Sequence, residues 1–453
     1  MSPHAMTEVD DDMAALRNHV SAPVALPGER VYDRATPWNV AVPVRPGAVV
    51  FTSSASDVAQ VMRFASDRGL RVAVQATGHG AVPIGADTVL VLTTGLTECV
   101  VDPAARTARI GAGVTWQTVL DAATPHGLAP LCGSAPGVGV VGYLTGGGVG
   151  PLVRTVGLSA DHVRAFELVT GAGHVLRVTP DEYADLFWGL RGGKSMLGIV
   201  TAVEIDLLPI AEFYGGAIYF DGEHAAEVLH QWQRWTLDLP ESVNTSICIQ
   251  QLPPLPGIPE PLAGRMTVAV RYTAVGDFAE AQRLLEPMRA AAPSLIDALG
   301  VMPYAAIGAV HADPVDPMPT HEDHALLREL TPEAAEALLA ACGPGSNSPQ
   351  TIVELRLLGG ALARPPRHRS AFCHRNALYA LSVIGVLAPQ AGEAVVGHAA
   401  HLVNAVAPWS TGGQIPNFAA SADPGRPSRC YNEDALHWLR ALATRYDPAA
   451  VMR

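Results

Sequence analysis

The chain has 453 residues, and its 30 basic against 43 acidic side chains give a formal net charge of −13. An acidic chain without a run of Lys or Arg is a poor nucleic-acid binder, because phosphate contacts need clustered positive charge. No uninterrupted apolar run reaches the length of a membrane span, and acidic residues near the start replace the pattern of a signal peptide. We therefore expect a cytoplasmic protein with no nucleic-acid or membrane partner.

The first 210 residues alternate short strand and helix signals. A helix is expected over 56–69, because Asp57 lies in the first turn, apolar residues recur at helical spacing and Gly69 can end it. A second helix is expected over 115–126, and a hairpin over 163–178. The other strands expected in this part are 48–51, 71–74, 88–92, 107–110 and 198–208.

From residue 211 to 402 longer alternating runs are separated by helical segments. The expected strands are 216–220, 245–250, 266–272, 351–358 and 377–386, and the expected helices are 224–237, 278–292 and 332–341. Strands of this length with helices between them predict an α+β domain with one sheet and helices on one face. The last residues return to short elements and a helix over 433–446. The predicted division is 1–210, 211–404 and a C-terminal segment 405–453 that returns to the first domain.

Two glycine motifs are candidate ligand sites. Gly137 to Gly142 matches G-x-G-x-x-G, but a loop precedes it and further glycines follow it, which disfavours a Rossmann nucleotide site. Eight glycines between Gly133 and Gly150 expose backbone N–H groups, which suits a pyrophosphate held by backbone. His79 lies between two glycines after an apolar strand, where an imidazole is a candidate base, ligand or covalent attachment point.

The sequence gives little indication of a metal site or of cysteine chemistry. His321 to His324, with His311 and Asp313 upstream, and the pair His398 and His401 contain metal-ligand residue types, but neither matches H-E-x-x-H. The first group more simply indicates a solvated helix start after a proline-rich loop. The six cysteines form no C-x-x-C pair, so no metal or disulfide framework is expected. Lys194 is the single lysine, which we attribute to compositional bias.

In ordered succession these motifs resemble the berberine-bridge-type FAD-linked oxidases of the vanillyl-alcohol-oxidase superfamily, and in particular the hydroxynicotine oxidases. The residues that carry the resemblance are Arg45-Pro46, Gln75 to Gly80, Asp102, Arg106 to Val114, Val138 to Tyr143, Gly146 to Gly148, Arg154, Gly157-Leu158, Asp161, Leu186 to Gly193, Gly198 to Thr201, Gly359 to Ala361, Ala371-Phe372, His374-Arg375, Pro408 to Gly413, Asn417-Phe418 and Tyr446 to Pro448.

The resemblance implies a two-domain α+β fold of the PCMH-type. An FAD-binding domain is built from the N-terminal half and the tail, and a substrate domain has an antiparallel sheet covered by helices. It implies a covalent bond from His79 to the flavin. A second link is not expected, because Ala135 occupies the position of the family's cysteine and Cys132 lies three residues earlier. The cofactor-binding residues that it implies are Thr77, Gly78, His79, Gly80, Ala81, Gly133, Ser134, Gly137, Val138, Gly139, Gly142, Tyr143, Gly147, Gly148, Gly198, Val200 and Asn417.

The resemblance does not assign the catalytic base, because this chain departs from the family at the motifs that would carry it. The family's tyrosine two residues before Asn417 is Ile415 here, and its Gly-Asn-Phe-Gly is Ser195 to Gly198. The catalytic candidates are Tyr379, His374, Asn417 and Tyr143. Glu354 and Arg356 are further candidates, since a period of two places them on one strand face.

The leading hypothesis is an oxidase that removes a hydride from an alcohol or amine-type carbon of a small specialised metabolite. The electrons would pass through FAD to O2 and give H2O2. The alternatives are a flavin-containing cyclase or drug-binding protein without net oxidation, suggested by Ile415, and a nicotinamide dehydrogenase. A monomer or homodimer acting on a small molecule is expected, with no metal.

Overall fold

Helix α2 in the N-terminal half of the chain follows its local sequence signals closely. The computed structural model describes residues 11–452, and helix α2 spans Ala55–Arg68. The Ser54 side chain accepts from the Asp57 N–H, and the Asp57 carboxylate accepts from the Ser54 N–H, which satisfies two free donors of the first turn. Gly69 ends the helix with a φ of +66°. The helix predicted over 56–69 is confirmed.

Helix α2 covers a small, mostly parallel sheet with strand order β1-β2-β4-β3. The apolar stripe of the helix, including Val58 and Met62, packs on Val50 and Val89 of the sheet. The strands are β1 Val24–Ala25, β2 Ala48–Phe51, β3 Arg71–Gln75 and β4 Thr88–Leu92. Strand β3 ends at Gln75, so its carboxyl end leads directly into the loop that carries His79.

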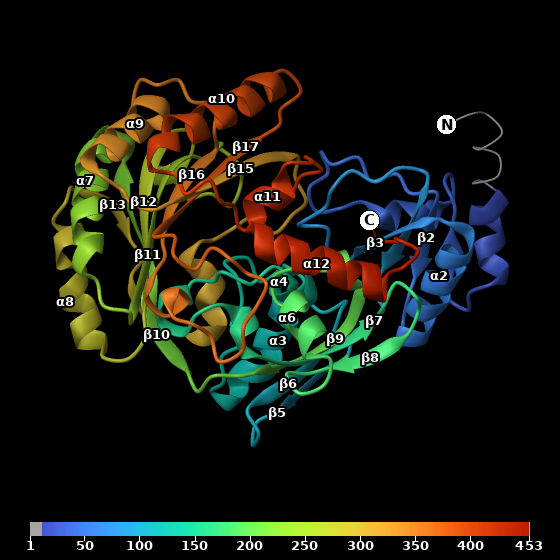
Figure 1. The fold of residues 1–453 in the computed structure, drawn as a ribbon. Coiled ribbons are helices and arrows are strands. Elements are labelled where there is room, and N and C mark those ends of the chain that lie inside the picture. Colours follow the sequence, from blue (N-terminus) through green and yellow to red (C-terminus); the bar gives the residue numbers. More distant parts are fainter. Residues whose placement is uncertain (1–10, 453) are drawn as a thin grey trace.

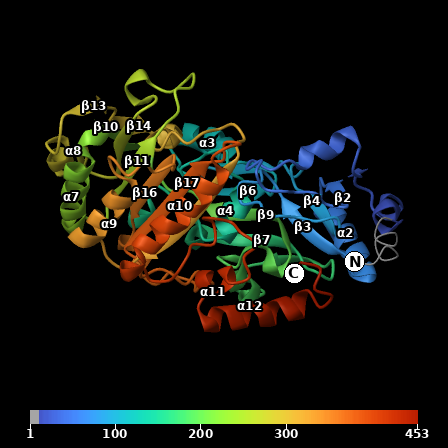
Figure 2. The same ribbon diagram turned by 90° about the horizontal axis from the view of Figure 1, so that it is seen from above.

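A five-stranded antiparallel sheet with order β5-β6-β9-β7-β8 completes this half of the molecule. Its strands are β5 Cys99–Asp102, β6 Thr107–Gly111, β7 Val163–Val169, β8 Val175–Val178 and β9 Ile199–Asp206, and its helices are α3 Trp116–Ala123, α4 Val140–Thr145, α5 Val153–Val156 and α6 Ala184–Leu190. The C-terminal helices α11, Arg426–Cys430, and α12, Glu433–Tyr446, lie along this half, and α12 contacts α6 (Figures 1 and 2). The tail therefore returns to the N-terminal part.

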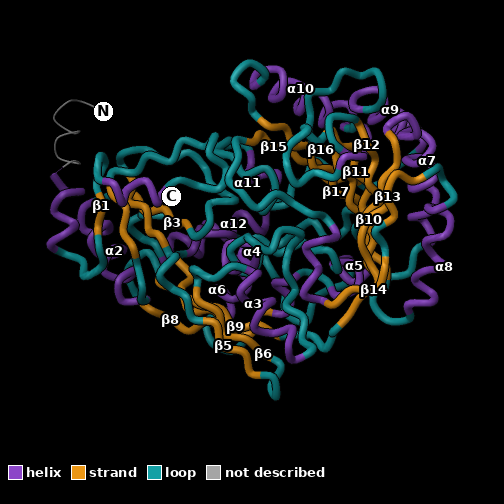
Figure 3. Tube along the Cα trace, turned by 180° about the vertical axis from the view of Figure 1, so that it is seen from behind, coloured by secondary structure: helices purple, strands orange, loops and turns teal. Residues whose placement is uncertain are grey.

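The other half is one eight-stranded antiparallel sheet with helices on its outer face. Its strands are β10 Glu212–Asp221, β11 Val243–Gln251, β12 Met266–Ala274, β13 Ser294–Asp297, β14 Gly300–Pro303, β15 Thr320–Leu327, β16 Ile352–Leu357 and β17 Tyr379–Val386. Its helices are α7 Ala225–Trp235, α8 Phe278–Arg289, α9 Pro332–Cys342 and α10 Gly392–Ala405, which line the side of the sheet away from the first half (Figure 3). The predicted two-domain fold and helix-covered antiparallel sheet are confirmed.

The inner face of this sheet meets the end of the glycine-rich segment. Thr273 Oγ1 donates to the Pro151 carbonyl oxygen at 2.7 Å, and the Arg154 N–H donates to Asn244 Oδ1 at 2.7 Å. Polar side chains on this face are therefore directed at the first half of the molecule, while the opposite face is filled by apolar side chains from the helices. The two halves meet along a line where the glycine-rich segment faces the sheet.

One expected element is wrong. Residues 321–324, expected at a helix start, belong to strand β15, which pairs with β17 in antiparallel register. The preceding Pro317 and Pro319 favour extended backbone, and an edge position was open beside β17. Within residues 11–452, no helix combines the length and the apolar character that crossing a membrane requires.

Candidate active site

The loop after β3 presents His79 on a fixed backbone. Gly78 has a φ of +78°, and a Cβ atom there would lie 2.6 Å from the Cα atom of Pro37, so this position requires glycine. The His79 ring stacks on Trp38 with a centroid distance of 4.8 Å and an interplanar angle of 16°. The Trp38 N–H donates to the Thr77 carbonyl oxygen at 3.1 Å. The N-terminal segment thus holds both the loop and the imidazole in place.

His79 is neutral at neutral pH. Burial lowers its pKa to about 4, against the opposing effect of the Asp313 carboxylate. Its Nδ1 lies 2.8 Å from Thr77 Oγ1, and its Nε2 has no hydrogen-bond partner among the described residues. A neutral imidazole retains an unprotonated nitrogen that can act as a nucleophile. The ring is therefore suited to the covalent attachment that the resemblance implies.

The glycine-rich segment divides into two parts, and the first, which we call the open half (residues 134–142), borders free space. A Cβ atom added at Gly137, Gly142 or the neighbouring Gly80 would meet nothing within 4 Å. Gly139 would lie 3.3 Å from Ala76 Cβ, so the open half adjoins the His79 loop. The N–H groups of Gly80 and Gly137 have no acceptor among residues 11–452. Unpaired N–H groups beside free space can bind an anion such as a pyrophosphate.

The second part, which we call the filled half (residues 146–150), is packed against the protein itself. A Cβ atom at Gly147 would lie 2.6 Å from the Phe372 ring, and one at Gly150 would lie 2.3 Å from the Cys132 carbonyl oxygen. Gly148 has a φ of +78° and lies against Tyr143. Gly133 also packs on the Tyr143 ring. The glycine density here makes room for protein atoms, so the interpretation of the whole segment as a ligand cradle is corrected for this half.

Lys194 and Asn417 join the open half to the C-terminal tail. Lys194 Nζ donates to the Gly142 carbonyl oxygen at 3.1 Å and to Asn417 Oδ1. Asn417 Nδ2 donates to the Tyr143 carbonyl oxygen at 2.8 Å. Burial, together with the nearby Arg426 guanidinium, lowers the pKa of Lys194 to about 7. Asn417 therefore lies beside the open half, at the place where a cofactor contact is predicted.

The remaining predicted cofactor residues are held mainly by the fold. The Ala81 N–H donates to the Gly78 carbonyl oxygen at 3.2 Å, and Ser134 and Val138 are half-buried within the open half. Gly198 has a φ of +132°, and Val200 is buried in the core of the five-stranded sheet. Their contacts with FAD stay predictions.

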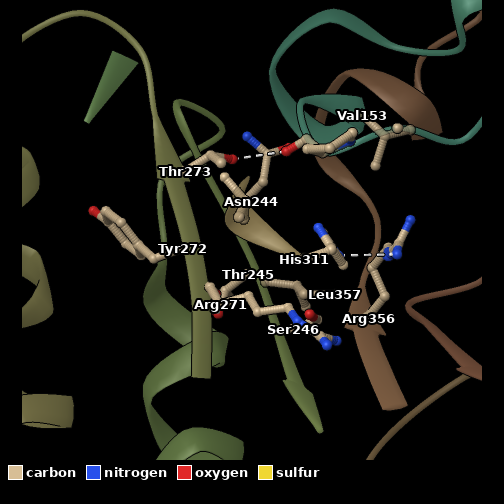
Figure 4. A pocket seen from close by; sticks show the side chains of 13 residues that line it. Val153, Asn244, Thr245, Ser246, Arg271, Tyr272, Thr273, His311, Arg356 and Leu357 are labelled. Atoms are coloured by element: carbon tan, nitrogen blue, oxygen red, sulfur yellow. Dashed lines mark hydrogen bonds between the residues drawn. The ribbon is translucent and has the colours of Figure 1, made fainter. Parts of the chain in front are cut away.

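The inner face of the large sheet carries the buried polar side chains of Ser246, Arg271, Glu354 and Arg356. His311, which follows the short 3-10 helix Tyr304–Val310, contacts Glu354 and Arg356, and we call these five residues the sheet-face cluster. Glu354 Oε1 accepts from Arg271 Nη1 at 2.8 Å and from Ser246 Oγ at 2.6 Å. Its Oε2 accepts from Arg356 Nη2 at 3.3 Å. Ser246, Arg271, His311 and Arg356 line a small cavity whose other wall includes residues 150–151 (Figure 4).

Electrostatics exclude Glu354 as a base near neutral pH. Burial disfavours its ionised form, but the guanidinium groups of Arg356 and Arg271 outweigh burial and hold the pKa of Glu354 well below 4.5. His311 is neutral, because burial lowers its pKa despite its contact with Glu354. Glu354 and Arg356 share one strand face as expected. Their pairing makes the carboxylate a structural anion.

Two predicted catalytic residues point elsewhere. Tyr379 lies on the outer face of the sheet, where its hydroxyl pairs with Thr236 Oγ1 at 3.1 Å and its ring packs near Trp232. Its predicted catalytic role is wrong, because Tyr379 is one of the alternate residues of β17 whose side chains face the covering helices. The His374 ring fills the space beside Gly413, with Nε2 2.8 Å from the Arg429 carbonyl oxygen. His374 is therefore tied to the tail.

Tyr143 and Cys132 are core residues beside the site. The Tyr143 ring packs edge-on against Trp116 at 5.6 Å, and burial raises the pKa of its hydroxyl, which lies 3.4 Å from Ser159 Oγ. A protonated, enclosed phenol is poorly suited to act as the base. Burial also raises the pKa of the Cys132 thiol to about 12. That Cys132 does not replace the cysteine missing at Ala135 stays a prediction.

The metal reading gains no support from the described residues, where no group of three or more His, Cys, Asp or Glu is arranged to hold an ion. His321 and His324 are separated by the alternation of β15, and His324 Nδ1 lies 2.7 Å from the Leu381 carbonyl oxygen. The His398 and His401 rings are 5.9 Å apart on α10, and His398 contacts the Ala341 carbonyl oxygen.

The residues present fit FAD in two respects. The unpaired N–H groups and free space at Gly80 and Gly137 suit its pyrophosphate, and the neutral His79 suits its attachment. A loop, not a strand, precedes Gly137, and only the short α4 follows Gly142, so the Rossmann alternative is not supported.

Three residues beside the site escaped the sequence interpretation. Trp38 has no motif around it, because stacking on His79 depends on a distant part of the chain. Arg271 was detectable as a lone charge in an apolar strand. We attribute the single lysine, Lys194, to compositional bias from the sequence alone, although a lysine next to glycines can indicate a functional site.

Comparisons with known proteins place these features in a family. Residues 46–179 match the FAD binding domain family. The (R)-6-hydroxynicotine oxidase of Paenarthrobacter nicotinovorans is 29% identical over 310 residues, which are 66% of each chain. An FAD-dependent monooxygenase of Fusarium proliferatum is 35% identical over 176 residues, 38% of this chain and 34% of that protein. The matches thus span 66% and 34% of these two relatives.

Solved structures share the whole fold. The 6-hydroxy-D-nicotine oxidase from Arthrobacter nicotinovorans superimposes with a TM-score of 0.84 at 24% identity, over 96% of this chain and 97% of that one. BBE-like 1 of Physcomitrella patens gives 0.82 at 21%, over 98% and 97%. Together with the His79 loop and the glycine-rich segment, these findings show an FAD-binding domain over residues 46–179 and, for the whole chain, the fold of the hydroxynicotine oxidase and BBE-like structures.

Proposed function

We propose that this protein is an FAD-dependent oxidase that removes a hydride from an alcohol or amine-type carbon of a small specialised metabolite. The observation that carries the proposal is the neutral His79, stacked on Trp38 beside the open half. Bound FAD would supply the redox chemistry, taking the hydride and passing the electrons to O2 to give H2O2. The names of similar proteins, which include hydroxynicotine and carbohydrate oxidases, support this reaction class.

The chain's own residues would hold the cofactor at both ends. The open half and Gly80 offer unpaired N–H groups for its phosphates, and His79 offers a ring nitrogen for a single covalent bond. His79 would be the residue that holds the flavin through this bond, and its neutral ring would supply the nucleophilic nitrogen. Trp38 would keep the imidazole in the plane required for the attachment.

The sheet-face cluster would form the opposite wall, against the substrate. Its charged side chains are buried and hydrogen-bonded, so they can orient a polar substrate without rearranging. Because Glu354 stays ionised and Tyr379 faces away, neither is assigned as the proton acceptor. The alternative without net oxidation loses its motivation, since Ile415 is buried in an apolar cluster with Phe372 and Leu358 and fills space there.

The decisive experiment is an absorbance spectrum of the purified protein before and after acid precipitation. A flavin spectrum that stays with the pellet, and that moves to the supernatant in His79→Ala, is expected. His126→Ala, at an exposed position in the short 3-10 helix that follows α3, is the matched control and should keep the flavin in the pellet. A colourless protein would overturn the proposal.

Oxidase activity is tested separately by anaerobic mixing with a panel of alcohols and amines. Loss of the flavin band near neutral pH, followed by H2O2 formation when air is admitted, is expected for a true substrate. Because one relative is named a monooxygenase, the product should also be analysed after reaction in 18O2. Incorporation of the label into the product would replace the oxidase proposal by an oxygenation.

A further inference from the structure

Two hydrogen-bond donors of the sheet-face cluster lie buried without a partner. Arg271 Nε and His311 Nδ1 are both enclosed, and no atom of the described residues accepts from either. Arg271 is 4% exposed and His311 is 7% exposed, so water outside the protein does not satisfy them. Buried polar groups are almost always paired, and each exception needs an explanation. Both residues line the cavity between the sheet and residues 150–151 (Figure 4).

Two contacts of His311 Nε2 bear on the tautomer of its ring. Arg356 Nη2 lies 3.1 Å from it, and Glu354 Oε1 lies 3.3 Å from it. The shorter contact is with a guanidinium, which can only donate, so we assign Nε2 as the acceptor and place the ring proton on Nδ1. Arg271 Nε is a donor in every state. The cavity therefore offers two N–H groups and requires an acceptor.

The charge of the cluster points to an anion as that acceptor. Arg271 and Arg356 carry two positive charges, and Glu354 supplies one negative charge in direct contact with them. His311 is neutral, and Asp313 influences Arg271 only from beyond ion-pair contact at a half-buried position. One positive charge is thus left without a contacting counter-charge in a buried site, where an unpaired charge is unfavourable.

The size of the cavity limits the anion. The space available to the centres of water-sized groups is about 20 Å³, which accommodates one or two water molecules or a carboxylate. A guanidinium presents parallel N–H groups that match the two oxygens of a carboxylate. A ring or a sugar does not fit in this space and would have to lie outside it, toward the open half.

We infer that the sheet-face cavity binds a carboxylate, and that the substrate is a carboxylate-bearing alcohol or amine whose acid group occupies this cavity. The carboxylate would accept from Arg271 Nε and His311 Nδ1 and neutralise the excess charge. The substrate part of this inference rests on the proposed oxidase function, because it needs the reacting carbon to lie between the cavity and the flavin site. The anion-binding part stands on the cluster alone.

The test is calorimetric titration of the purified, flavin-containing protein with acetate in chloride-free buffer, and with acetamide as the neutral isostere. Acetate is expected to bind at one site per chain, and acetamide at least tenfold more weakly. Equal binding of both compounds, or no binding of acetate up to 50 mM, would overturn the inference. Binding of chloride without binding of acetate would also overturn it, since it would indicate a halide site.

Removing a positive charge and removing a negative charge from the cluster should change acetate binding in opposite directions, whereas a purely structural role of these side chains would not. Arg271→Gln should weaken acetate binding at least tenfold, whereas Glu354→Gln should strengthen it, because the competing carboxylate is removed. Arg289→Gln is the control, since Arg289 pairs with Asp297 at the outer edge of the sheet. If Arg271→Gln does not fold, Arg271→Gln combined with Glu354→Gln keeps the charge balanced and should still lose acetate binding. Weakening by Glu354→Gln would contradict the inference.

Failure of this inference and failure of the oxidase function give different results. A yellow protein that oxidises neutral alcohols and ignores acetate keeps the function and loses the carboxylate site. A colourless protein that binds acetate keeps the site and loses the function. For the substrate itself, 4-(hydroxymethyl)benzoate should bleach the flavin at least tenfold faster at low concentration than 4-(hydroxymethyl)benzamide, and equal rates would contradict the substrate assignment.

Discussion

The two walls of the candidate site obtain their polar groups in opposite ways. The open half of the glycine-rich segment offers backbone N–H groups and free space at Gly137 and Gly142. The sheet-face cluster offers buried side chains whose charges are fixed by one another, with Glu354 between Arg271 and Arg356. The first wall is suited to a constant partner such as a cofactor phosphate. The second can differ between proteins of the same fold, because it depends on five side chains.

The same comparison holds within the glycine-rich segment. Gly137 has space around it, whereas Gly150 lies against the Cys132 carbonyl oxygen. Glycine is required in both places for different reasons: one glycine leaves room for a ligand and the other lets two backbone segments approach. A run of glycines therefore does not by itself indicate how much of it contacts a ligand.

The largest expected effect comes from breaking the sheet-face cluster. Arg271→Met should lower the free energy of unfolding by about 3 to 5 kcal/mol, because Glu354 loses its shortest guanidinium contact in a buried site. Urea unfolding followed by tryptophan fluorescence measures it. Adding Glu354→Gln to Arg271→Met should restore most of the loss, since no buried carboxylate is left unpaired. A double variant as unstable as the single one would show that packing, not charge, sets the stability here.

The next effect separates the two halves of the glycine-rich segment. Gly150→Ala should lower the free energy of unfolding by about 2 kcal/mol, because its Cβ would lie 2.3 Å from a backbone oxygen that cannot move freely. Gly137→Ala should change it by less than about 0.5 kcal/mol, since nothing lies within 4 Å. Its effect should appear instead as a lower flavin content. Equal stability losses would erase the distinction between the halves.

Sequence reasoning succeeded where structure is determined locally. The first-turn Asp57 and the closing Gly69 of α2, and the hairpin of β7 and β8, are predicted with boundaries close to those observed, because turns and periodicity act over a few residues. The family's ordered motifs placed His79 and the open half together, which no single motif could do. The two-domain architecture followed from the change in strand length after residue 211.

The sheet-face cluster could not be assembled from the sequence. Ser246, Arg271 and Glu354 come from three strands, and their contacts depend on the register that pairs β11 with β12 and β16. Tyr379 was misplaced for a related reason: alternation gives two faces of a strand but does not say which is inner. Trp38 and His79 meet across separate segments, and Lys194 meets Asn417 across an even longer stretch of the chain. Such contacts become visible only once the fold is known.

A smaller effect concerns how the free energy of unfolding changes at acidic pH. The pKa of Glu354 is held well below its usual value of 4.5, so its stabilising contribution is complete above pH 4.5 and is lost as the pH falls below that value. The free energy of unfolding of the wild type should therefore fall relative to that of Glu354→Gln by at most about 1.4 kcal/mol per pH unit. Urea unfolding at pH 5.5, 4.5 and 3.5 measures the difference. A constant difference would mean that Glu354 is not ionised in the folded protein.

A last pH-dependent effect tests the contact between the Lys194 amine and the Gly142 carbonyl oxygen of the open half. Lys194 is the single lysine, so reductive 13C-methylation gives one side-chain NMR signal besides that of the N-terminus. Its titration midpoint is expected near 7, because burial and Arg426 lower its pKa. Since the folded pKa lies below the unfolded value of 10.5, the wild type should gain stability relative to Lys194→Met as the pH rises from 7 to 10.

The Asn417→Asp variant is a useful contrast, because a carboxylate beside Nζ should move the midpoint back up. A wild-type midpoint above 10 would place the amine in solvent, and the open half would then have only backbone groups to hold the cofactor.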